Sequence, residues 1–278
     1  YFLGLQHFFG MTDKVGQFSL WRLSKKISTR AGGKKSVISV CLGISAVVVI
    51  LSSCAGNNAQ SDKSPEALDR VAQSLQNTGD YATAAKLYYQ ILLANPDNGN
   101  ALKGLGASLR KTNQLTEARK FFEAELKKDS KSPVILEELG KTYIASGLAQ
   151  DGIKIYKALL AVDSSSVAAM NGLGVCLDMK KQHDEAQSWY RKALQETPDD
   201  INIKSNLGLS LALGKKTKES INILLPLSQE TSPSVNVLHN LAIAYALSGQ
   251  VGKAREIFSK ELNNKEVEAN LATLRAIN

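Results

Sequence analysis

Small residues recur every 34 positions along most of this chain, and this period constrains the fold more than any other feature. The first series holds Ala72, Gly106, Gly140, Gly174, Gly208 and Ala242. A second small series follows twelve positions later, and a large apolar series four positions after that, from Tyr88 to Phe258. A fixed period of this length, sustained over six units, predicts a repeat array rather than one globular core.

Each unit divides into two helical segments around a turn. In the first unit, apolar residues fall at i, i+3, i+4 and i+7 on both sides of a turn at 77–80. Ser64 and Pro65 supply an N-cap and a first-turn proline for the opening helix. We therefore expect an all-α solenoid of about six helix-turn-helix repeats over 65–268. The expected units are 65–98, 99–132, 133–166, 167–200, 201–234 and 235–268, with a capping helix over 269–278.

Glycine inside a helix costs about 1 kcal/mol relative to alanine, so the recurring glycines need a packing reason. We expect each to lie where a neighbouring helix approaches closely, beside the large apolar residue of the same unit. The G-x-G pairs at 104–106 and 172–174 fall within these helices with no strand before them. Packing therefore explains them better than phosphate binding does.

The pattern resembles the tetratricopeptide repeat, and the resemblance covers all six units. The best unit, 167–200, carries the motif at Leu173, Gly174, Ala186, Tyr190, Ala193 and Pro198. The departures are the absence of Trp at the fourth position, Gly152 and Ser220 in place of the usual alanine, and Pro226 late in the fifth unit. The resemblance implies a right-handed α-solenoid whose first helices line a concave, protein-binding groove.

In this repeat family the groove residues lie two, five, nine and twelve or thirteen places into a unit. Candidates at these places include Arg110, Lys111, Glu137, Lys141, Asn171, Asp178, Asn202, Ser205 and His239, and Asn206 and Asn240, at position six, are further candidates. The cationic side chains are candidates to hold an acidic or C-terminal carboxylate group of a protein partner, and the asparagines to bond an extended peptide backbone. The alternative is that these side chains form an ordinary solvated face.

The segment before the repeats has the composition of a secretion leader. The chain begins with Tyr1 and its first methionine is Met11, so it is either a fragment or a reading frame extended upstream, with residues 1–10 before the true start. Residues 1–53 carry seven basic groups and one acid, and an apolar run of 16 residues occupies 36–51. A basic region followed by a short apolar core is typical of a signal peptide.

Leu51, Ser52, Ser53 and Cys54 resemble the lipobox of bacterial lipoproteins. That resemblance implies cleavage before Cys54, acylation of its thiol, and a flexible tether over 54–64. The alternative, an uncleaved membrane span, usually needs about 20 apolar residues and does not account for the cysteine. Ala55 follows Cys54, where an aspartate would resemble an inner-membrane retention signal, so an outer-membrane lipoprotein facing the periplasm is expected.

Charge and motif content exclude several function classes. Of the net charge of +8, the leader supplies +6 and residues 54–278 about +2, so no nucleic-acid footprint is expected. Neither His183 nor His239 has a cysteine or carboxylate at metal-ligand spacing, and no nucleophile, base and orienting group come together. Cys176 falls within a helical pattern, where we expect a small buried apolar residue rather than a reactive thiol. We expect no enzyme activity, no cofactor, no metal and no small-molecule substrate.

The end of the chain resembles the TadD lipoproteins of the tight-adherence (Flp) pilus system. The similarity rests on NLA at 240–242, AYALSG at 244–249 and ANLA-x-LR at 269–275. It implies a pilotin-like factor for a secretin or another pilus-assembly component. The alternative is another tetratricopeptide lipoprotein adaptor, serving type IV pili, an envelope protease or outer-membrane protein assembly; an enzyme with an unrecognised site is a third.

Overall fold

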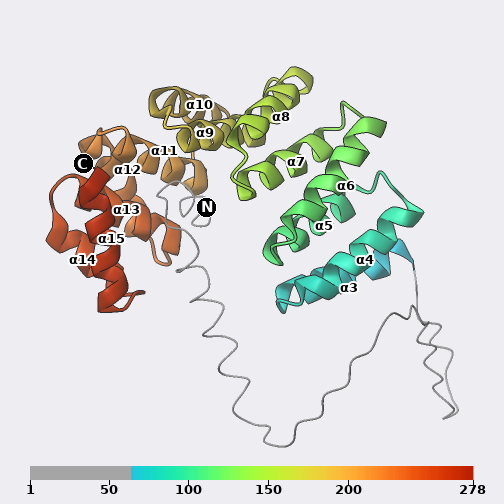
Figure 1. Cartoon of the computed structure of the whole chain (residues 1–278), viewed down its shortest axis with the longest axis horizontal. Helices are drawn as coiled ribbons and strands as arrows, with labels where there is room; N and C mark the ends of the chain where they lie inside the picture. The colour runs from blue at the N-terminus through green and yellow to red at the C-terminus, as the bar shows by residue number, and fades with distance from the viewer. Residues whose placement is uncertain (1–63, 278) are drawn as a thin grey trace, which may run out of the picture.

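The computed structural model describes residues 64–277, and all regular structure in that part of the chain is helical (Figure 1). The thirteen helices are α3 (Pro65–Asn77), α4 (Tyr81–Ala94), α5 (Gly99–Lys111), α6 (Leu115–Lys128), α7 (Pro133–Ala145), α8 (Ala149–Val162), α9 (Val167–Met179), α10 (His183–Glu196), α11 (Ile201–Leu213), α12 (Thr217–Ser228), α13 (Val235–Leu247), α14 (Val251–Phe258) and α15 (Asn264–Ile277).

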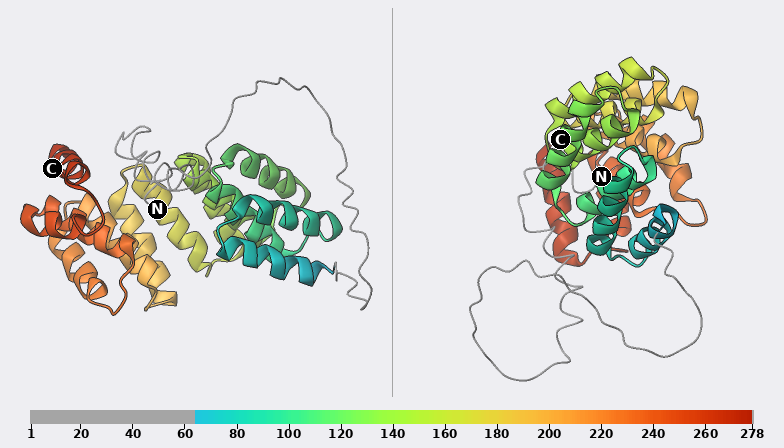
Figure 2. Two further views of the ribbon diagram at one scale, coloured as in Figure 1. Left: turned by 90° about the horizontal axis from the view of Figure 1, so that it is seen from below. Right: turned by 90° about the vertical axis from the view of Figure 1, so that its right-hand side faces the viewer.

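The first twelve helices form six consecutive pairs, and the expected all-α solenoid is confirmed. Each first helix packs on the second helix of its own pair and on the first helix of the next pair. Figure 1 shows the pairs following a curved path from α3 to α15, and Figure 2 shows the same succession from two further directions. The leader, the lipobox, Cys54 and the tether up to residue 63 lie outside the described residues.

The turn within each pair uses one left-handed residue, and these residues are also 34 positions apart. They are Gly79, Asn113, Gly147, Lys181, Lys215 and Gly249, with φ between 59° and 87°. The next amide then bonds back to a helix carbonyl five residues earlier, as in Asp80 N to Leu75 O at 2.8 Å. This closure satisfies carbonyls at the helix end that would otherwise lack partners.

Tyr156 shows why the mid-helix glycines recur. A Cβ built at Gly140 would lie 2.6 Å from Cζ of Tyr156, and one built at Gly172 would overlap the same ring. The ring of one second helix is thus held between the first helices of its own and the next repeat. Gly174 stands in the same relation to Tyr190, with 2.7 Å from a built Cβ to Cε1. The expected packing role of the G-x-G pair at 172–174 is confirmed.

The two departures from the usual alanine have local explanations. Ser220 is fully buried, and its hydroxyl donates to the carbonyl of Gly208 at 2.6 Å. Gly152 leaves room for Cys176, because a Cβ there would lie 2.6 Å from Sγ. Cys176 is buried and free, as expected, and burial raises its pKa to about 12, so the thiol is an inert core group.

The closing helix begins at Asn264, five residues before the expected start of the cap at 269. A capping box sets this boundary: Glu266 N donates to Asn263 Oδ1 at 3.1 Å, and Asn263 N donates to Glu266 Oε2 at 3.0 Å. The helix buries Val267 and Leu271 on α13 and α14. It covers the last repeat where a further first helix would pack.

Candidate functional site

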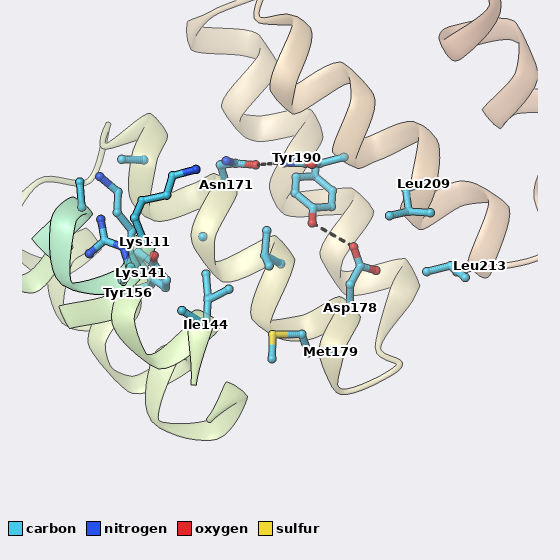
Figure 3. A pocket seen from close by; sticks show the side chains of 17 residues that line it. Lys111, Lys141, Ile144, Tyr156, Asn171, Asp178, Met179, Tyr190, Leu209 and Leu213 are labelled. Atoms are coloured by element: carbon cyan, nitrogen blue, oxygen red, sulfur yellow. Dashed lines mark hydrogen bonds between the residues drawn. The ribbon is translucent and has the colours of Figure 1, made fainter. Parts of the chain in front are cut away.

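A pocket of about 490 Å³ lies along the first helices of the second to fifth repeats (Figure 3). Two rows of side chains, each repeating every 34 residues, form much of its lining. Position nine of the repeats supplies Ala107, Lys141, Val175 and Leu209. Position thirteen supplies Lys111, Ala145, Met179 and Leu213. These are groove positions implied by the resemblance, so α5, α7, α9 and α11 present one continuous surface.

Arg110 and Lys141 line one end of the pocket, but each already has a carboxylate partner. Nη1 of Arg110 lies 2.8 Å from Oε2 of Glu138, whose side chain is only 1% exposed. Lys141 Nζ lies 2.9 Å from the other oxygen of Glu138 and 2.5 Å from Glu137. Burial acts to lower the pKa of Lys141, but the two carboxylates outweigh it and leave the pKa above its usual value. Both cations therefore neutralise a buried acid, which limits their availability to a partner.

Lys111 is the cation at this end that remains exposed, and no ion pair to it is found among residues 64–277. Asn171 and Asn206 line the middle of the pocket from α9 and α11. Asn206 Nδ2 donates to Asn171 Oδ1 at 2.9 Å, so the two predicted groove asparagines are paired with each other. This bond uses the acceptor of Asn171, and no hydrogen bond from its Nδ2 is found in the described part of the chain.

His239 and Asn240 do not line the pocket. Asn240 is 7% exposed, and its Nδ2 donates to Oγ of Ser205 at 2.9 Å, between α13 and α11. The ring of His239 is also 7% exposed and lies 5.7 Å from the ring of Phe258. Burial lowers the pKa of His239, and Glu261 partly offsets this. The structure thus gives both side chains packing roles at the C-terminal end of the solenoid.

Asp178, a candidate groove residue, borders the pocket as the centre of a partly buried hydrogen-bond cluster that was not predicted from the sequence. Its Oδ2 accepts from the hydroxyl of Tyr190 at 2.9 Å and its Oδ1 from that of Ser210 at 2.7 Å. Nδ1 of His183 lies 2.8 Å from Oδ1, so His183 does have a carboxylate partner, across the α9–α10 turn. Burial raises the pKa of Asp178, although these three hydrogen bonds act to lower it.

The same arrangement occurs in the first repeat, with Gln76 in place of Asp178. Gln76 accepts from the hydroxyl of Tyr88 at 3.0 Å and donates to Oγ of Ser108 at 2.8 Å. The sequence does contain a signal for this cluster. It is a polar residue at position twelve, a tyrosine twelve residues later, and a serine at position ten of the next repeat. This recurrence identifies the cluster as a connection between repeats.

The Asp178 cluster does not have the geometry of a nucleophile. Ser210 donates directly to the carboxylate, whereas a catalytic serine would donate to a histidine base. Among residues 64–277, no group of three His, Cys, Asp or Glu side chains is placed to hold a metal ion. No helix in the same range is long and apolar enough to cross a bilayer. The geometry favours binding over catalysis.

Comparison with known families agrees with this geometry. The model of the family described as "Tetratricopeptide repeat" matches residues 72–133 and 137–201. The chain is a helical solenoid of repeats, and its residues 72–133 and 137–201 match the tetratricopeptide repeat. The matched residues lie in the first four repeats and the first residue of the fifth, and the structure extends the same pairing through α11–α14. Such repeats act as protein-interaction scaffolds and are typically not enzymes.

Solved structures share this repeat fold at low sequence identity. A tetratricopeptide repeat protein from Parabacteroides merdae aligns with a TM-score of 0.62 and 15% identity, over 78% of this chain and 87% of that one. PilF of Pseudomonas aeruginosa aligns with a TM-score of 0.57 and 12% identity, over 76% of this chain and 98% of that one. A search of curated protein sequences gives no significant match.

Proposed function

We propose that this repeat solenoid is an outer-membrane lipoprotein, facing the periplasm, whose groove binds protein partners during assembly of a tight-adherence (Flp) pilus. Its role toward the secretin is pilotin-like: it helps place or assemble the pore through which the pilus leaves. The observation that carries the binding role is the continuous groove formed by α5, α7, α9 and α11.

The groove has the mixed chemistry of a protein-binding surface. Its lining combines partly exposed apolar side chains such as Met179 and Leu213 with a few polar groups, and a partner segment buries apolar area on such a surface while the polar groups fix its register. Lys111 and Asn171 offer a charge and amide donors that no described residue uses. A solvated face without function would not need the apolar residues that α9 and α11 both place at positions nine and thirteen.

The final repeat and closing helix support the pilus assignment. The segments that resemble TadD lipoproteins, 240–242, 244–249 and 269–275, lie in α13 with the turn after it and in α15. The two helices pack on each other and form the C-terminal end of the solenoid. The similarity to PilF supports the fold alone, since identity is 12%. The pilus proposal therefore rests on the sequence of this end.

The lipobox supports the membrane location. Acylation at Cys54 would place the first repeat within ten residues of the bilayer surface, about 35 Å at full extension. Each buried CH₂ of an acyl chain contributes roughly 0.8 kcal/mol, so two or more chains give a stable anchor.

Deletion and complementation in a bacterium that carries this chain and an Flp system test the proposal. Loss of the chain should abolish surface pili and reduce heat-stable secretin multimers in the outer membrane. The wild-type gene should restore both, and Cys54→Ala should not, because it leaves the protein unlipidated. Unchanged pili and multimers in the deletion strain would refute the pilus role, and continued cleavage and membrane retention of Cys54→Ala would refute the anchor.

A further inference from the structure

We infer that the groove recognises one class of partner segment, which carries an acidic group at one end and large apolar side chains at the other. This inference rests on the proposed protein-binding role of the groove and adds the chemistry and orientation of the occupant. The acidic end lies over α5 and α7, and the apolar end over α9 and α11.

The charge of the groove is concentrated at one end. The pocket lining holds three cations, Arg110, Lys111 and Lys141, and one carboxylate, Asp178. Asp178 is fully engaged by its internal hydrogen-bond donors, and Glu137 with Glu138 offsets two of the three positive charges. One net positive charge therefore remains at the α5–α7 end, and Lys111 is its exposed carrier. A carboxylate that enters here gains a charge-assisted hydrogen bond, whereas a cationic group is repelled.

The other end of the groove is apolar. Figure 3 shows Leu209 and Leu213 on the side away from Lys111 and Lys141, with Met179 below Tyr190 and Asp178 in this view. Met179 and Leu213 are only partly buried, so they have surface left to cover. A methionine in such a place adapts to side chains of different shape. Large apolar side chains of a partner are the groups that gain from burial here.

The middle of the groove suits a polypeptide. The Nδ2 group of Asn171 offers hydrogen-bond donors between the charged and apolar ends, and a backbone carbonyl is the acceptor that every peptide supplies. The pocket is lined by four first helices that follow one another along a curved solenoid (Figure 1), and an extended polypeptide can run along such a row of helices. The observations therefore favour a single protein segment over a lipid surface.

Direct binding of defined probes tests this inference. The mature lipidated chain, in nanodiscs of phosphatidylcholine, is titrated with four labelled twelve-residue peptides. Two have a Leu/Met-rich half and an Asp/Glu-rich half, in either order. The third and fourth peptides keep the order of whichever of these two binds more tightly. The third has Lys in place of the acidic residues, and the fourth has Ser and Gln in place of the apolar residues. One of the first two should bind at least about ten-fold more tightly than the third and fourth.

Variants assign the two ends. Lys111→Glu should lower the affinity for the preferred acidic probe about five- to ten-fold and raise the affinity for the Lys probe. Leu213→Ser should lower the affinities for the acidic probe and the Lys probe by similar factors. Lys120→Glu makes the same charge change at an exposed site on α6, outside the pocket, and should alter neither. Circular dichroism confirms that each variant is folded before its affinity is compared.

Three results would overturn the inference: equal binding of acidic and Lys probes, equal binding of the apolar and Ser/Gln probes, or an effect of Lys120→Glu equal to that of Lys111→Glu. Loss of acidic-probe binding by the wild type in phosphatidylglycerol nanodiscs, at a salt concentration that screens the bilayer charge, would assign the groove to lipid headgroups instead. A deletion strain with normal pili, together with the predicted probe selectivity, would refute the pilus role and leave this inference standing.

Discussion

The hydroxyl oxygen of Ser210 lies 2.7 Å from Oδ1 of Asp178, so a side chain of α9 is bonded to the first helix of the next repeat. Tyr190 and His183 hold the same carboxylate from α10. Solenoid repeats contact only their neighbours, so stability depends on each interface between repeats. The carboxylate therefore joins three helices at the edge of the groove.

Removal of this carboxylate should destabilise the solenoid. Asp178→Ala leaves the hydroxyls of Tyr190 and Ser210 without their acceptor, and we expect the free energy of unfolding to fall by about 1–3 kcal/mol in urea titration. Asp199→Ala removes an acid whose side chain is fully exposed, and it should change stability by less than about 0.5 kcal/mol. Equal effects of the two substitutions would mean that the cluster does not stabilise the repeat interface.

One substitution at a left-handed turn residue should raise the free energy of unfolding. Lys181 adopts φ 61° and is exposed, so Lys181→Gly relieves a strained backbone without loss of a buried contact. We expect a gain of about 0.5–1 kcal/mol, because part of the relief is offset by the greater chain entropy of glycine. Gly79→Ala, at φ 87°, should instead destabilise by about 1 kcal/mol. A loss of stability in Lys181→Gly would contradict the strain argument.

The glycines that hold Tyr156 should not tolerate a methyl group. Gly172→Ala places a Cβ against the tyrosine ring, and overpacking should cost about 1–3 kcal/mol in thermal or urea unfolding. Gly252 provides the matched control, since nothing lies within 4 Å of a Cβ built there. Gly252→Ala should gain up to about 1 kcal/mol from helix propensity alone. Stabilisation by Gly172→Ala as well as by Gly252→Ala would contradict the close packing of Gly172 on Tyr156.

His239 should make stability depend on pH. Burial lowers its folded pKa below the usual 6.5, so from that value downward the unfolded chain binds a proton that the folded chain does not. The contribution is fully present above about pH 6.5 and is lost as pH falls toward the lowered pKa. The difference in unfolding free energy between pH 7.5 and 5.5 should therefore be smaller in His239→Gln than in wild type. An unchanged difference would show that another group controls this window.

The sequence predicted the repeat order because packing imposes it on single residues. A small residue and the ring that packs on it lie sixteen positions apart, as Gly140 and Tyr156 do. Because every repeat interface needs this pair, its period is visible in the sequence alone. Groove positions nine and thirteen follow from the same register. The start of the last helix was misplaced because the capping box at Asn263 and Glu266 overrides the repeat period.

Which groove side chains are free to bind a partner was harder to predict than which side chains line the groove. Glu138 pairs with Arg110 across 28 residues, and its burial depends on the room left by Gly106 in the preceding repeat. The pairing of Lys141 with Glu137 and Glu138 is at helical spacing and could have been predicted. Nothing in the sequence, however, indicates that Arg110 is neutralised by Glu138. The apolar groove residues Met179 and Leu213 were overlooked because apolar side chains at helical spacing are usually core, whereas a curved stack leaves some of them at its surface.

Site-specific photo-crosslinking in living cells tests the central claim, binding of a protein partner in the groove, most directly. A photoreactive amino acid is placed in the full chain at Met179, in the groove, or at Lys120, on the outer helix α6. The proposed function predicts that Met179 yields a crosslink to the secretin or another pilus-assembly component and that Lys120 does not. Crosslinks from Lys120 alone, or identical products from both sites, would contradict it.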